Sequence, residues 1–149
     1  MATFSRSAAL EWTGSYPRGT GTVTAGTAAF AVPASFPIVA GEPPGVTTPE
    51  ELLAASHAVC YGIGLRGQIA RRGGTARRVT VRATVTAEKG GGRIRIRASH
   101  LDALVDGLAG IDPGSLEDVA RAAEEACTIS ALLRASVPVT VSVRAGAVA

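Results

Sequence analysis

One segment with clear start and stop signals of an α-helix constrains the fold of this sequence more than any other part. Thr48 and Glu51 stand at the spacing of a capping box, and a proline occupies the first helical position after Thr48. Two glycines at 73–74 end the helical pattern, so we expect a helix over residues 49–71. In this interpretation Glu51 binds the backbone N–H of Thr48, whereas the carboxylate of Glu50 remains available to another group.

Strand patterns flank this helix on both sides. Before it, glycines and prolines divide residues 8–40 into short runs typical of a meander of antiparallel strands. After it, residues 78–100 alternate apolar and polar side chains around three consecutive glycines, which predicts a β-hairpin. A second helix over 115–135 follows, with Ser115 as its N-cap. Residues 128–135 either continue this helix or start a short new turn, and a final strand over 138–145 comes after them. We therefore expect the 149 residues to form a single α+β domain.

Composition excludes several classes of protein. A hydrophobic content of 46% fits a globular core, and no apolar stretch reaches the roughly 20 residues of a membrane span. The N-terminus lacks the apolar segment of a secretory signal, so we expect a soluble, cytoplasmic protein. The two cysteines and two histidines match no metal-binding spacing, and no metal site is expected.

The two cysteines, Cys60 and Cys127, both lie in apolar helical patterns. Free cysteine usually behaves as a small buried hydrophobe, so spacing alone favours structural roles. The alternative is that the two thiols meet for redox chemistry, because a static disulfide is uncommon in the cytoplasm. His57, one turn before Cys60, is a candidate base, but a structural histidine with satisfied hydrogen bonds is the favoured interpretation.

Three segments resemble a known family. TPEELLAASHAVC and EEACTIS resemble the two cysteine signatures of the OsmC/Ohr family, the osmotically inducible and organic-hydroperoxide-resistance proteins. WTGSYPRGTGTVT resembles the N-terminal strand pair of that family, and AASHAVC brings the chain closer to the OsmC branch. The resemblance implies an OsmC-like fold, with antiparallel sheets wrapped around two central helices in an intertwined homodimer.

The same resemblance implies an activity and its residues. Family members are thiol-dependent peroxidases, which makes Cys60 the peroxidatic and Cys127 the resolving cysteine, with Arg18 and Glu50 as charged partners. Organic hydroperoxides would be reduced to alcohols through a Cys60 sulfenic acid and a Cys60–Cys127 disulfide, as an antioxidant defence in the oxidative stress response. No cofactor is implied beyond an external thiol reductant, such as dihydrolipoyl groups or small thiols. Thr128 stands where the family often has proline, which puts the local geometry of Cys127 in question.

Physical reasoning supports these charged partners. Cys60 lies too far from the start of its own helix to gain from the helix dipole, so its thiolate needs a charge from elsewhere. Arg18 stays protonated when buried, and Glu50 would offset its desolvation. Glu50 and Cys60 are roughly 15 Å apart along one helix, so we expect a shared site to combine two subunits of an obligate homodimer. Small residues permit close helix approach there: Ala54, Ala55, Ala58, Gly62 and Gly64.

Two alternatives remain open. Arginines alternate along the predicted hairpin and offer one basic face to nucleic acid, with inert buried cysteines: Arg78, Arg82, Arg93, Arg95 and Arg97. Such alternation usually marks a solvated sheet face, so no nucleic-acid partner is expected. The other alternative is an OsmC-like redox sensor that oxidises without turnover.

Overall fold

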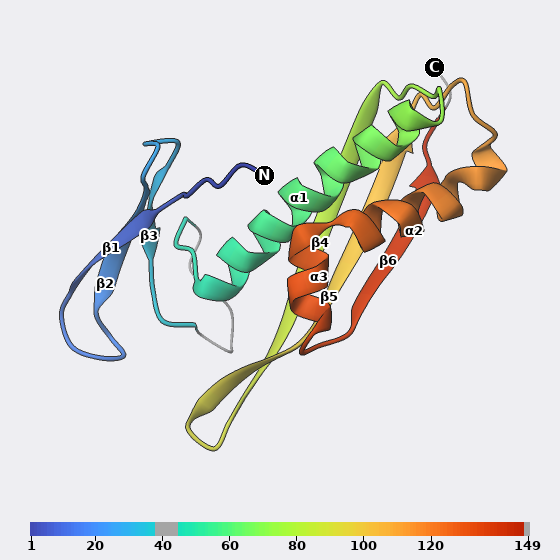
Figure 1. Ribbon diagram of the computed structural model, residues 1–149. Coiled ribbons are helices and arrows are strands. Elements are labelled where there is room, and N and C mark those ends of the chain that lie inside the picture. The colour runs from blue at the N-terminus through green and yellow to red at the C-terminus, as the bar shows by residue number, and fades with distance from the viewer. Residues whose placement is uncertain (38–44, 148–149) are drawn as a thin grey trace. The chain divides into compact units, whose positions relative to one another are not determined.

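The structure, a computed structural model, describes residues 1–37 and 45–147 and divides into two compact units, Met1–Leu52 and Leu53–Ala149. No helix in these residues is long and apolar enough to cross a membrane. The elements, labelled in Figure 1, are β1 (Ala8–Thr13), β2 (Thr20–Ala25), β3 (Ala31–Ala34), α1 (Pro49–Arg71), β4 (Arg78–Gly90), β5 (Arg93–Asp106), the 3₁₀ turn η1 (Pro113–Ser115), α2 (Leu116–Ala126), α3 (Thr128–Arg134) and β6 (Val139–Ala145).

The N-terminal unit contains an antiparallel meander in the order β1–β2–β3. The β1–β2 pair closes at Thr13 opposite Thr20, and the turn between them carries Arg18. Gly14 adopts φ +89° at the start of this turn, a conformation that glycine reaches without a steric penalty. The last residues of the predicted meander, 38–40, lie outside the described residues.

Helix α1 begins and ends at local sequence signals. The hydroxyl of Thr48 accepts the backbone N–H of Glu51 at 3.4 Å, as a capping residue should. The other half of the predicted capping box differs, because the Glu51 carboxylate accepts the hydroxyl of Thr47 at 2.7 Å. At the far end Gly73 adopts φ +79°, and the N–H of Gly74 reaches back to the carbonyl of Ile69.

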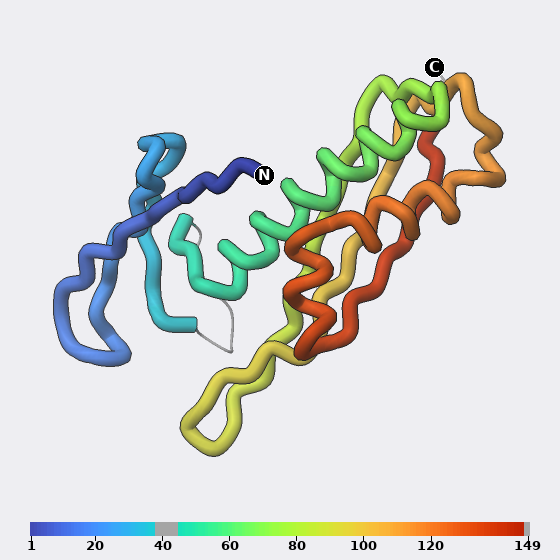
Figure 2. The backbone as a smooth tube through the Cα atoms, viewed as in Figure 1, coloured from blue at the N-terminus to red at the C-terminus, as the bar shows by residue number. Residues whose placement is uncertain are grey.

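The C-terminal unit is built on a three-stranded sheet in the order β4–β5–β6. Strands β4 and β5 form a long antiparallel hairpin with a register shift at Thr86/Ala87. Strand β6 pairs with β5 in parallel, over Ser99–Val105, so the prediction of antiparallel sheets is wrong for this one pair. The connection from β5 to β6 contains α2 and α3, and a helical crossover of this kind allows parallel pairing. The hairpin tip extends beyond the first residue of β6, Val139 (Figures 1 and 2).

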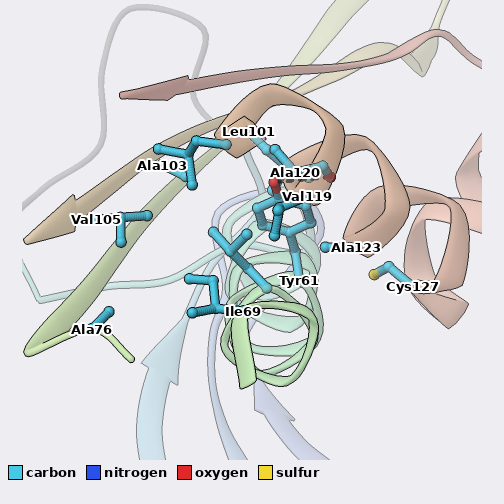
Figure 3. Packing of buried hydrophobic residues seen from close by; sticks show 12 residues of the cluster. Tyr61, Ile69, Ala76, Leu101, Ala103, Val105, Val119, Ala120, Ala123 and Cys127 are labelled. Carbon is cyan, nitrogen blue, oxygen red and sulfur yellow. Dashed lines mark hydrogen bonds between the residues drawn. The ribbon is translucent and has the colours of Figure 1, made fainter. Parts of the chain in front are cut away.

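The core lies between this sheet and the helices α1 and α2. Figure 3 shows Tyr61 and Ile69 of α1 directed toward β5 and α2, with Cys127 at the margin of the cluster. Each large apolar side chain buried here stabilises the fold by roughly 1.5–3 kcal/mol. The buried cluster comprises Tyr61, Leu65, Ile69, Ala76, Leu101, Ala103, Val105, Leu116, Val119, Ala120, Ala123 and Cys127.

The predicted second helix over 115–135 is two helices that are separated at Cys127. That residue has extended backbone angles, φ −76° and ψ 118°, which end α2 and start α3. The prediction of Ser115 as N-cap is wrong, because Ser115 already has helical angles and makes no side-chain cap bond. Asp112 has the capping role for the preceding 3₁₀ turn, where its side chain accepts the N–H of Gly114.

The arginines of the β4–β5 hairpin line its exposed face, as the alternating pattern predicts. Arg78 forms an ion pair with Asp106 at 2.8 Å, and Arg97 forms one with Glu88 at 2.7 Å. Charges of both signs therefore meet on this solvated face.

Candidate active site

The two cysteine sulfurs meet in the C-terminal unit. The Sγ of Cys127 lies 3.1 Å from the Sγ of Cys60, and both are free thiols. Cys60 comes from the middle of α1, and Cys127 comes from the break between α2 and α3. A disulfide needs about 2.05 Å between sulfurs, so a small movement suffices to join them.

Cys60 is half-buried, and its environment favours the thiolate. Burial on its own would raise the pKa of Cys60. Three hydrogen bonds to the sulfur outweigh burial and lower that pKa: the backbone N–H groups of Ile129 and Thr128, and the Cys127 thiol. The two N–H groups belong to the first turn of α3, where no intrahelical partner exists for them. A sulfur placed there gains donors that are already oriented toward a negative charge.

Cys127 has the opposite electrostatic character. It is 3% exposed, and burial together with the hydrogen bond to Cys60 raises the pKa of the Cys127 thiol. The backbone N–H and the hydroxyl of Ser130 partly oppose this rise. The Cys127 sulfur accepts that N–H at 3.4 Å and so caps α3. The pair therefore combines one sulfur poised as a nucleophile with one held as a neutral thiol.

His57 lies one turn before Cys60 and is fully buried. Its Nδ1 lies 2.8 Å from the Oγ of Ser99 on β5, and its Nε2 lies 2.8 Å from the Oγ of Ser130 on α3. Burial lowers the pKa of His57, and the carboxylate of Glu124 acts weakly in the other direction. The predicted structural histidine is thus satisfied at both nitrogens, and it contacts the segment that holds Cys127.

Tyr61 and Glu124 form the wall of the site on the side of α2. The hydroxyl of Tyr61 donates to the carbonyl of Ala120 at 3.3 Å, and burial raises the pKa of this hydroxyl well above its usual range. Glu124 forms an ion pair with Arg134 of α3. These contacts fix α1, α2 and α3 around the two sulfurs.

Arg18 and Glu50, the charged residues that the family resemblance singles out, belong to the N-terminal unit. Arg18 is exposed in the turn between β1 and β2. Glu50 lies in the first turn of α1, and its Oε2 is buried without a hydrogen-bond partner in the described residues. No ion pair joins Arg18 to Glu50 within residues 1–37 and 45–147. An unsatisfied buried carboxylate oxygen is unusual, because such groups normally have a donor.

In the described part of the chain, no group of three or more histidine, cysteine or acidic side chains is placed to hold a metal ion.

Sequence reasoning missed the donors that act on Cys60. It considered the start of α1, twelve residues before Cys60, and predicted that an arginine must act instead. The start of α3 supplies N–H groups from a different part of the chain. Cys127 caps α3 with its sulfur but is not one of the usual N-cap residues, so no clear sequence signal marked the start of α3.

Comparison with known proteins identifies a family model and curated relatives that resemble this chain. The family model for OsmC-like proteins matches residues 42–142. Peroxiredoxin OsmC of Escherichia coli strain K12 is 29% identical over 91 residues, and the match covers 61% of this chain. The match spans 63% of the length of that relative and of the peroxiredoxin OsmC from Shigella flexneri.

Solved structures share the fold over nearly the whole chain. An organic hydroperoxide resistance protein from Elizabethkingia anophelis has a TM-score of 0.77 at 19% identity, covering 97% of this chain and 99% of that one. The organic hydroperoxide resistance protein OhrB of Bacillus subtilis has a TM-score of 0.73 at 22% identity, covering 96% and 100%. With a family model that matches most of its length and this fold, the chain belongs to the OsmC/Ohr family.

Proposed function

We propose that this protein is a thiol-dependent peroxidase that reduces organic hydroperoxides to alcohols. The observation that carries the proposal is the 3.1 Å contact between an activated thiol, Cys60, and a buried partner thiol, Cys127. The names of the relatives, peroxiredoxin and organic hydroperoxide resistance protein, support the same chemistry.

In the first step the Cys60 thiolate attacks the distal oxygen of the hydroperoxide. The S–O bond forms as the O–O bond breaks, and the leaving alkoxide takes a proton to become the alcohol. The two-electron oxidation leaves Cys60 as a sulfenic acid. The N–H groups of Ile129 and Thr128 hold the starting thiolate, so they keep the nucleophile in its reactive form.

In the second step the Cys127 sulfur attacks the sulfur of the Cys60 sulfenic acid. An S–S bond forms, the S–O bond breaks, and one water leaves. An external dithiol then reduces the Cys60–Cys127 disulfide by thiol–disulfide exchange and is itself oxidised to a disulfide. Dihydrolipoyl groups and small thiols both have this chemistry. Because the cycle consumes reducing equivalents, we place the protein in the cytoplasm.

Arg18 and Glu50 complete the proposed site as an ion pair that faces the peroxide. The buried Oε2 of Glu50, which has no hydrogen-bond partner among residues 1–37 and 45–147, supports this role, because a guanidinium would supply the missing donors. Ten residues separate Glu50 from Cys60 on α1, so we assign the composite site to two protomers of a homodimer.

Exposed apolar side chains on α1 support the homodimer. Val59 is 61% exposed and Ile63 is 70% exposed, one turn apart on the same face. Gly62 and Gly64, which were expected to permit close helix approach, are partly exposed and border the chain's own sheet and second helix. A Cβ at Gly62 would contact Val81, and a Cβ at Gly64 would contact the carbonyl of Ala123. Sedimentation equilibrium tests the dimer, and a monomer at assay concentrations contradicts the composite site.

Peroxide turnover with dithiothreitol or dihydrolipoamide tests the proposal, with tert-butyl and cumene hydroperoxide compared against hydrogen peroxide. We expect Cys60→Ser to abolish consumption. We expect Cys127→Ser to consume one equivalent and then to stall as sulfenic or over-oxidised Cys60. Non-reducing mass spectrometry after one equivalent of hydroperoxide distinguishes the alternatives. Two free thiols contradict a peroxidase, and a disulfide that excess dithiol does not cycle indicates a redox sensor.

A further inference from the structure

The buried histidine beside the two sulfurs has no part in the cycle described above. His57, Ser99 and Ser130 are all fully buried, and they form a continuous hydrogen-bonded row from β5 through α1 to α3. Ser130 extends the row to the reacting sulfur, because both its N–H and its hydroxyl interact with the Cys127 Sγ. The hydroxyl of Ser130 therefore bridges the imidazole and the resolving thiol.

A hydroxyl has one proton, so this bridge has two hydrogen-bonded arrangements. In the reduced pair the Cys127 S–H donates to the Cys60 sulfur. Once Cys60 is a sulfenic acid, the Cys127 S–H donates instead to the Ser130 Oγ, and the Ser130 O–H donates to the Nε2 of neutral His57. When Cys127 is a thiolate, the Ser130 O–H donates to the sulfur, and the Nε2–H of His57 donates to the Ser130 Oγ. Passing from the first arrangement to the second moves one proton from sulfur to imidazole.

The second step of the proposed cycle needs this transfer. The attacking species is a thiolate, whereas burial raises the pKa of Cys127 and keeps it a thiol near neutral pH. Burial lowers the pKa of His57, so its ring is neutral and able to accept a proton. The groups that face the ring are Ser99 from β5, Ser130 from α3 and, through its charge, Glu124 from α2. The carboxylate of Glu124 favours the imidazolium that the transfer forms.

We propose that His57, acting through Ser130, removes the proton from the Cys127 thiol as this thiol condenses with the Cys60 sulfenic acid. This inference rests on the proposed function. The atoms balance: the thiol proton reaches Nε2, the thiolate forms the S–S bond, and the S–O bond of Cys60 breaks. The departing hydroxide becomes water by taking one proton, either from His57 through Ser130 or from solvent. In the second case His57 releases its own proton to solvent afterwards. Ser130 touches the reacting sulfur, whereas His57 is a positioning and proton-accepting residue.

Single-turnover kinetics separate this step from the first. Reduced protein is mixed with one equivalent of cumene hydroperoxide and quenched at intervals with dimedone, which traps sulfenic acid. Mass spectrometry then counts trapped sulfenic acid and disulfide. In Ser130→Ala and His57→Gln we expect sulfenic acid to form at the wild-type rate and disulfide to form about 100-fold more slowly.

The pH profile distinguishes a relay from a structural role. Without the relay, condensation depends on spontaneous ionisation of Cys127, so its rate in Ser130→Ala should rise about tenfold per pH unit toward alkaline pH. The wild-type rate should vary much less between neutral and alkaline pH. A purely structural role slows condensation by the same factor at every pH, and this outcome overturns the inference.

Ser99→Ala is the matched control, because it removes the other hydrogen bond of the same buried ring and leaves the path from His57 to Cys127 in place. We expect it to lower thermal stability as the other variants do and to keep a wild-type pH profile. If Ser130→Ala does not fold, the dependence of the condensation rate on pH in His57→Gln tests the relay on its own. Wild-type condensation rates in both variants overturn the relay and leave the peroxidase standing. Absence of both sulfenic acid and disulfide in the wild type overturns the peroxidase itself.

Discussion

Replacing Thr128 by proline tests whether the start of α3 activates Cys60. Thr128 is the first residue of α3, and its N–H is one of the two backbone donors that lower the pKa of Cys60. Proline has no N–H, yet its fixed φ suits the first position of a helix. Thr128→Pro therefore removes one donor while the helix keeps a favourable first residue. Thr128→Ala is the matched control, because it removes the same exposed side chain and retains the N–H.

The size of the effect follows from two opposing terms. A hydrogen bond to a charged group contributes about 1.5–3 kcal/mol, and the half-buried position of Cys60 favours the lower figure. About 1.5 kcal/mol corresponds to a roughly tenfold loss of thiolate below the thiol pKa. The remaining thiolate is more basic and a better nucleophile, with a Brønsted slope of about 0.4–0.5. The first-step rate near neutral pH should therefore fall by about three- to fourfold.

Two measurements check this prediction. Thiolate absorbance near 240 nm against pH gives the titration of Cys60, best followed in a Cys127→Ser background that leaves one thiol. Stopped-flow kinetics with cumene hydroperoxide give the first-step rate. The proline restricts the unfolded chain but also removes a hydrogen-bonded N–H, so we expect the free energy of unfolding to fall rather than rise. A folded Thr128→Pro protein with the titration and rate of Thr128→Ala would refute the role of this N–H group.

Three further predictions concern His57, Arg18 and Leu65. Burial holds the pKa of His57 below its ordinary 6.5, so the unfolded state binds the proton more readily, and the free energy of unfolding should decrease as pH falls from about 6.5 toward the folded-state pKa. Urea unfolding across this range should show a flatter dependence in His57→Gln, and equal slopes would contradict the assignment. Arg18→Ala should raise the pKa of Cys60 and slow the first step, and an unchanged thiol titration counts against Arg18. Leu65→Ala, at a fully buried position, should cost about 2–5 kcal/mol in urea unfolding, and a loss below 1 kcal/mol would mean that the core rearranges around the cavity.

Elements whose signals are local could be predicted from the sequence. Thr48 and the glycines near residue 73 act on backbone groups within a few residues, so the bounds of α1 follow from them. The β4–β5 hairpin follows from its alternation and its glycine turn. The end of α2 at Cys127 could not be predicted in this way, because the apolar pattern continues through the break.

Pairings between distant segments could not be predicted from spacing. The parallel pairing of β6 with β5 depends on where α2 and α3 cross the sheet. No pattern of neighbouring residues predicts the course of that crossover. The hydrogen bonds of His57 join residues 42 and 73 positions away, so a histidine interpreted as structural could not be connected to the Cys127 segment.

The sequence by itself determined that this α+β chain places Cys60 on a capped helix. The reason is that the spacing of apolar residues and the capping residues both depend on close neighbours in the chain. The family signatures also named Cys127 as its partner. Only the tertiary structure decided that sulfurs 67 positions apart lie 3.1 Å from each other and that the start of α3 lowers the pKa of one of them. The physical reason is that a thiol pKa depends on burial and on the donors around it, and packing brings those donors from segments far away in the chain.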